Sequence, residues 1–139
     1  MSKEQKIKEA HELLFEEGLK VRREVVGDKY VDNALKNGSS EFGRAMQEYV
    51  TEVCWGSIWT RPGLERKQRS LLNVAMLCAL NRSTELGGHV RGALANGATE
   101  LEIRETILQA AGYCGFPAGI EGFKVGERVI NEWKAEKGL

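Results

Sequence analysis

The chain contains 139 residues, and its 20 lysine and arginine residues balance 20 aspartate and glutamate residues, so its formal net charge is zero. A chain of this length forms about one domain, and its interleaved charges create no field that would attract nucleic acid or an anionic membrane surface. It has no run of about 18 apolar residues, and its charged N-terminus does not match a secretory signal, so we expect a cytoplasmic protein without a membrane span.

The N-terminal part of the sequence is predicted to be helical. Apolar residues recur three, four or seven positions apart over residues 3–26, which favours an amphipathic helix that ends at Gly27-Asp28. A short helical segment at residues 30–35 stops at Asn37-Gly38. Ser39 or Ser40 then caps a helix that runs to about residue 55. The inner side of this helix is expected to carry Phe42, Met46, Tyr49, Val50 and Val53.

Residues 56–63 are predicted to form a loop, because Pro62 restricts the residue before it to extended conformations and Gly63 suits a turn. The next helix, at residues 65–80, is apolar nearly all round in its second half, which is typical of a central helix. Ser83 is expected to cap a helix that ends at Asn96-Gly97.

Two further helices complete the chain. Thr99 and Glu102 have the spacing of a capping box at the start of the first of them. Residues 115–117 break that helix, and the last one is expected at about residues 118–137. No alternating pattern predicts a strand, and no linker-like stretch divides the sequence. The sequence therefore predicts an all-α chain with one domain over residues 1–139.

Six of the 16 glycines fall inside predicted helices, where each costs about 1 kcal/mol relative to alanine. The absence of a side chain lets helices, a ligand or another subunit approach closely, and the pattern does not decide among these three. The six positions are Gly87, Gly88, Gly92, Gly119, Gly122 and Gly126.

The cysteine and histidine content indicates neither a disulfide framework nor a metal site. Cys54, Cys78 and Cys114 are widely separated, and the two histidines, His11 and His89, have no zinc-site spacing relative to them. We therefore expect reduced thiols and no bound metal.

His89 is a candidate general acid or base. On a helix, Glu85 lies one turn before it and Arg82 two turns before it, so the three side chains share a face. A carboxylate at that distance can accept a hydrogen bond from the imidazole, fix its tautomer and raise its pKa toward working pH. The alternative is a structural histidine in the seam between packed helices.

Trp59 and Arg61 place an aromatic plane and a guanidinium group on the predicted loop. A planar set of donors there suits a carboxylate. The alternative is that Trp59 anchors the loop to the core while Arg61 is solvated. Arg69, at the start of the central helix, is a further cation that can point inward.

Four segments together resemble the carboxymuconolactone decarboxylase family. They are WGSIWTRPGL at residues 55–64, RSLLNVAML at 69–77, HVRGA at 89–93 with NGAT at 96–99, and YCGFPA at 113–118. The resemblance extends from about residue 21 to residue 129. It implies an all-helical subunit of the alkylhydroperoxidase-like fold that assembles into a ring, typically a homohexamer, with active sites near subunit contacts.

The resemblance also implies an activity, which is conversion of 4-carboxymuconolactone to 3-oxoadipate enol-lactone and carbon dioxide in protocatechuate catabolism. The conjugated lactone of this substrate accepts the electron pair left by carbon dioxide as a dienolate, so no cofactor is expected. Peroxidases of the same superfamily use a CxxCxxxH motif. Because Arg82 and Glu85 stand at the two cysteine positions here, disulfide-linked peroxide reduction is excluded.

Site roles follow from the resemblance as expectations. His89 delivers a proton or stabilises the dienolate, Glu85 orients it, and Trp59 excludes water. The carboxylates of a small anionic substrate are bound by Arg61 together with Arg69 or Arg82.

The sequence departs from the family pattern at Gly87-Gly88 and at Lys124, where bulkier residues and a histidine are common. Two alternatives to the lactone decarboxylase therefore stay open. One is a decarboxylase or isomerase of another unsaturated keto acid or carboxylated aromatic polyketide, and the other is a non-catalytic oligomeric binding protein.

Overall fold

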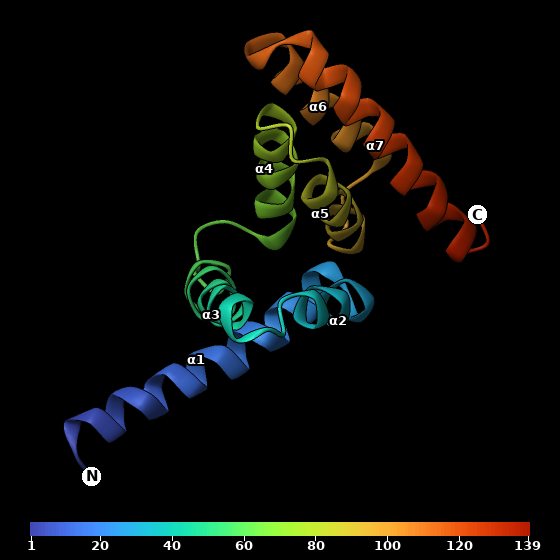
Figure 1. Cartoon of the computed structure of the whole chain (residues 1–139). Coiled ribbons are helices and arrows are strands. Elements are labelled where there is room, and N and C mark those ends of the chain that lie inside the picture. The colour runs from blue at the N-terminus through green and yellow to red at the C-terminus, as the bar shows by residue number, and fades with distance from the viewer. The chain divides into compact units, whose positions relative to one another are not determined.

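A computed structural model describes residues 1–139, and all its regular elements are helices (Figure 1). This confirms the predicted all-α class. The helices form two compact units, residues 1–63 and residues 64–139. The single-domain organisation expected from the missing linker stays a prediction. None of the helices combines the length and apolar character that crossing a membrane requires.

The N-terminal unit contains four helices: α1 (Lys3–Val26), α2 (Asp28–Asn37), α3 (Glu41–Tyr49) and the π-helix η1 (Val50–Ile58). The side chain of Ser2 caps α1 by accepting a hydrogen bond from the Gln5 N–H, and that of Ser40 caps α3 in the same way from the Gly43 N–H. Ser40 is one of the two caps predicted for this helix. Its start is therefore encoded locally.

The helical path continues further than the sequence predicted. In place of a loop from residue 56, η1 extends to Ile58, and the Trp59 N–H donates to the Cys54 carbonyl, five residues earlier, at 3.0 Å. The Thr60 hydroxyl donates to the Gly56 carbonyl at 2.7 Å and so satisfies an acceptor near the helix end. Pro62 constrains only its immediate predecessor, so it ends the helix later than expected.

Helices α1 and η1 cross with their backbones in contact at two glycines. A Cβ atom on Gly18 would lie 2.0 Å from the Thr51 carbonyl oxygen, and one on Gly56 would lie 2.6 Å from the Leu14 carbonyl oxygen. Neither position has room for a side chain. Beside this crossing lies the core of the unit, made of Val21, Val25, Val26, Val31, Trp55 and Trp59.

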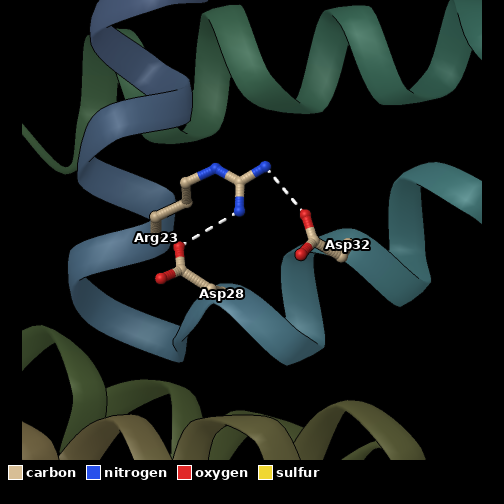
Figure 2. A network of polar contacts seen from close by, with 3 residues as sticks. All are labelled: Arg23, Asp28 and Asp32. Atoms are coloured by element: carbon tan, nitrogen blue, oxygen red, sulfur yellow. Dashed lines mark hydrogen bonds and ion pairs between the residues drawn. The ribbon is translucent and has the colours of Figure 1, made fainter.

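An ion-pair network spans the turn between α1 and α2 (Figure 2). Arg23 donates to Asp28 at 3.1 Å and to Asp32 at 2.9 Å, and these hydrogen bonds raise its pKa. The turn passes through Gly27 at a φ of 89°, a left-handed conformation that favours glycine. Because the two aspartates are exposed, the network helps to orient α2 more than it stabilises the fold.

The prediction for the inner side of α3 was wrong. Phe42 is 95% exposed and Met46 is 68% exposed, Tyr49 and Val53 are also exposed, and Val50 is half-buried. The periodicity identified a real apolar stripe, but periodicity does not determine which surface covers a stripe. In this unit η1 packs against α1, and no residue of α3 is buried.

The C-terminal unit contains α4 (Arg66–Ala79), α5 (Ser83–Ala95), α6 (Glu100–Cys114) and α7 (Phe116–Glu136). Helix α4 packs against the other three, as predicted for a central helix. The capping box of α6 is confirmed, because Thr99 and Glu102 exchange backbone-to-side-chain hydrogen bonds of 3.0 Å. The core of the unit includes Val74, Cys78, Leu86, Val90, Ile103, Ile107, Val125 and Val129.

Two helix starts in this unit differ from the prediction. Arg82 occupies the N-cap position of α5, and the Ser83 hydroxyl instead donates to Glu121 at 3.3 Å. Helix α7 begins at Phe116 rather than at residue 118, because a proline fits within the first helical turn.

Some of the predicted helical glycines mark tight packing within the unit. A Cβ atom on Gly119 would lie 2.4 Å from the Cβ atom of Ala111, and one on Gly122 would lie 2.7 Å from the Cys78 sulfur. These two glycines therefore allow α7 to approach α6 and α4 closely.

Gly87 differs from those glycines, because a Cβ atom there would make ordinary contacts of 3.5–3.7 Å with Val129, Arg128 and Val125. Alanine at this position is expected to raise the free energy of unfolding by about 0.5–1 kcal/mol, since it lowers the entropy of the unfolded chain without a clash. Urea denaturation of Gly87→Ala checks this. A decrease in stability would show that the position is more crowded than the structure indicates.

Candidate active site

His89 lies half-buried on α5, where Gly88 and Val90 on either side are buried. Its Nδ1 atom is 3.5 Å from Nδ2 of Asn73, on α4. An amide nitrogen can only donate, so this long contact favours the tautomer in which Nδ1 accepts and the ring proton is on Nε2.

The pKa of His89 shifts in the direction opposite to the one predicted. Burial lowers it to about 4, and the opposing effect of the Glu85 charge is smaller. The expectation that Glu85 raises the pKa toward working pH is therefore corrected, because removal of water outweighs a carboxylate that is itself exposed. Near pH 7 the imidazole is therefore neutral.

The other predicted groups of the C-terminal unit have different environments. Arg82 and Glu85 are exposed at the start of α5, whereas Arg69 is half-buried in the first turn of α4. Arg69 and Asn73 are four residues apart and share a face of α4. Asn73, which contacts the imidazole from α4, was missed by the sequence analysis. The available signal was a polar residue inside the apolar run at 71–80.

Trp59 and Arg61 belong to the N-terminal unit. Trp59 is only 5% exposed and stacks on Trp55, with ring centroids 4.8 Å apart and planes inclined by 21°. Arg61 is exposed, and its N–H donates to the Ile58 carbonyl at 3.1 Å. This packing agrees with the alternative in which Trp59 anchors the chain to the core.

The three cysteines are free thiols. Burial raises the pKa of both Cys54 and Cys78, which keeps these thiols protonated and poorly nucleophilic near pH 7. No group of three or more histidine, cysteine, aspartate or glutamate side chains is arranged to hold a metal ion. In the C-terminal unit, His89 is thus the ionisable group whose pKa is shifted by a large amount.

Comparison with known proteins places this arrangement in a family. Residues 44–128 match the carboxymuconolactone decarboxylase family. The chain is 52% identical over 124 residues to nitrosuccinic acid decarboxylase npaB of Metarhizium robertsii, which covers 89% of this chain and 86% of the relative. It is 39% identical over 118 residues to 4-carboxymuconolactone decarboxylase of Acinetobacter baylyi, which covers 85% of this chain and 87% of the relative.

A third relative is an uncharacterized 15.0 kDa protein of the nqo9-nqo10 intergenic region of Paracoccus denitrificans. It is 35% identical over 98 residues, which cover 64% of this chain and 73% of the relative. The all-helical fold and the similarity to two decarboxylases define the class of protein as a carboxy-lyase. The chain belongs to the carboxymuconolactone decarboxylase family. Both the family and the enzyme class predicted from the sequence are confirmed.

Proposed function

We propose that this chain removes carbon dioxide, without a cofactor, from a small carboxylic acid that carries its own electron acceptor, and that nitrosuccinate is the first candidate substrate. The observation that carries the substrate assignment is the 52% identity to nitrosuccinic acid decarboxylase over 89% of this chain. The neutral, half-buried His89 supports the proposed chemistry.

Nitrosuccinate bears a nitro group on the carbon next to one of its two carboxylates. When the bond to that carboxylate breaks, its electron pair stays on the carbon and moves onto the nitro oxygens as a nitronate. A proton added to the carbon then gives 3-nitropropanoate, so one proton is consumed for each carbon dioxide released. The nitro group supplies the electron sink for which other decarboxylases need a cofactor.

His89 is proposed to donate its Nε2–H to an oxygen of the developing nitronate. A donor held in place before the reaction stabilises new negative charge strongly where water is scarce. The neutral form of His89 is useful, because a charged imidazolium would also stabilise the carboxylate of the bound substrate. The transition state would then be stabilised less relative to the bound substrate, and the gain in rate would be smaller. The contact with Asn73 favours the tautomer that this role requires. In this proposal His89 stabilises charge, and the proton for carbon comes from another donor.

The remaining roles are proposals of the same kind. Arg69 or Arg82 is proposed to bind the carboxylate that is retained, because a guanidinium matches a carboxylate with two parallel N–H donors. Arg61 of the N-terminal unit is a further candidate for carboxylate binding. Trp59 excludes water from the bound acid. Glu85 influences His89 through its charge, and its exposure makes it a secondary contributor.

The second candidate substrate is 4-carboxymuconolactone, on the basis of the 39% identity to its decarboxylase in Acinetobacter baylyi. Its conjugated lactone would accept the electron pair as a dienolate, and His89 would donate to the lactone oxygen in the same way. Other unsaturated keto acids fit the same scheme. The candidates therefore differ in the acceptor group and not in the protein chemistry.

A substrate panel tests this proposal. Carbon dioxide release is expected from nitrosuccinate, with a kcat/KM above that for 4-carboxymuconolactone by about 100-fold, which is within the range that pocket contacts supply. The rate is expected to survive addition of a chelator. Faster turnover of the lactone would reverse the order of the candidates. Absence of carbon dioxide from every acid in the panel would favour the binding-protein alternative.

We also propose that the chain forms a homo-oligomer, with the hexameric ring implied by the family resemblance as the expected state. The stripe on α3 and η1 supports this, because monomeric proteins rarely expose a large contiguous apolar patch. The stripe consists of Phe42, Met46, Tyr49 and Val53. Sedimentation velocity should give a single species of about six chains, and a monomer at micromolar concentration would contradict the proposal.

A further inference from the structure

Arg22, on α1, is a buried cation without an acidic partner. Its residue is 6% exposed, and its Nη1 atom donates to Gln47 Oε1 at 2.9 Å and to Thr51 Oγ1 at 3.3 Å. Both acceptors are neutral. The Nε atom is buried and has no hydrogen-bond partner. The adjacent Arg23 is more exposed and pairs with two aspartates, so the two neighbouring arginines have opposite environments.

No negative charge compensates this guanidinium at neutral pH. Burial lowers the pKa of Arg22, and the groups that act on its charge are Tyr30, Cys54 and Arg23. A tyrosine is neutral near pH 7, and burial raises the pKa of Cys54, so that thiol is protonated. Arginine nevertheless stays charged in proteins. A buried charge without a counter-charge is strongly unfavourable for folding, which suggests that Arg22 serves a function other than stability.

The geometry of the guanidinium indicates which edge a ligand would use. Nη1 directs its two hydrogens to Gln47 and Thr51. The opposite, side-on edge carries Nε–H and one Nη2–H in parallel, and neither atom has a protein acceptor. Two parallel N–H groups match the two oxygens of a carboxylate.

The charge of Arg22 interacts with Cys54, which packs against the apolar core of the N-terminal unit. Burial next to this core limits the access of water to the guanidinium and strengthens a charge-assisted hydrogen bond.

We propose that the side-on edge of Arg22 binds the carboxylate of a small organic acid. The choice of a carboxylate over other anions rests on the proposed function, since the substrate of a decarboxylase carries this group. Arg22 was not among the candidates from the sequence, and it adds a binding residue in the N-terminal unit to the cations considered above.

Succinate is a suitable probe, because it shares the dicarboxylate skeleton of nitrosuccinate and has no acceptor group that would permit decarboxylation. Isothermal titration calorimetry should show that Arg22→Lys weakens succinate binding by about tenfold or more, because an ammonium group keeps the charge but loses the parallel donors. The matched control is Arg23→Lys, one residue away and more exposed, which should bind succinate like the unmodified chain.

A second variant separates a binding role from a structural one. Without ligand, Arg22→Met is expected to unfold at the same temperature as the unmodified chain or higher, because it removes a buried charge that lacks a counter-charge. Succinate should raise the unfolding temperature of the unmodified chain and not that of Arg22→Met. A marked loss of stability in Arg22→Met would indicate a structural role and overturn the proposal.

Three further results would overturn it. They are equal succinate affinity in Arg22→Lys and the unmodified chain, binding of uncharged succinamide with the same affinity as succinate, and binding of inorganic phosphate in preference to succinate. None of these measurements depends on turnover. If only the proposed decarboxylation fails, carbon dioxide release is absent while succinate binding to Arg22 is intact. If only the Arg22 proposal fails, carbon dioxide is released while the expected succinate binding to Arg22 is absent.

Discussion

His89→Ala is expected to lower kcat for carbon dioxide release by about 10²–10³, the usual loss when one positioned hydrogen-bond donor to a developing anion is removed. The helical content measured by circular dichroism should not change, because the side chain is only half-buried. His89→Gln, which keeps an N–H donor but cannot titrate, should retain more activity than alanine. Equal kcat in all three proteins would remove His89 from the reaction.

The pH profile distinguishes a neutral imidazole from a charged one. Because burial lowers the pKa of His89 to about 4, its charge should not change between pH 5 and 8, and kcat/KM should show no inflection near 6.5. Glu85→Gln is the matched control and should have little effect on the profile. An inflection near 6.5 that disappears in His89→Gln would show that the imidazole acts in its charged form.

Gly18→Ala is expected to lower the free energy of unfolding by about 3 kcal/mol or more, the upper range for overpacking. Its Cβ atom would lie 2.0 Å from the Thr51 carbonyl oxygen, which belongs to the backbone of η1 and cannot rotate away. Urea denaturation measures the change. Gly112→Ala is the control, because a Cβ atom there meets nothing within 4 Å, and it should be neutral or stabilising. Similar stability of the two variants would show that α1 and η1 separate easily.

The elements set by local chemistry were predictable. The Thr99 capping box and the Ser40 cap depend on side chains within three residues of the groups they satisfy, so the sequence contains the whole interaction. The exposure of Phe42 was not predictable, because an apolar stripe indicates a contact surface but does not show whether this chain covers it. The π-helical extension to Ile58 likewise had no local signal in the sequence.

The candidate site was predictable in part. The position of His89 one turn after Glu85 identified it as a candidate, but the direction of its pKa shift depends on burial by residues distant in sequence. Asn73 reaches it from another helix. Arg22 and Arg23 are neighbours of the same residue type, and only the packing of η1 on α1 distinguishes the buried Arg22 from the half-buried Arg23.

The crossing at Gly18 and Gly56 also affects how this protein can diverge. Most contacts between helices drift over time through paired changes, in which one side chain grows as its neighbour shrinks. Where carbonyl oxygens and α-carbons meet directly, no such exchange is available. We therefore expect sequence variation among relatives that share this crossing to accumulate around these two positions, with glycine retained at both.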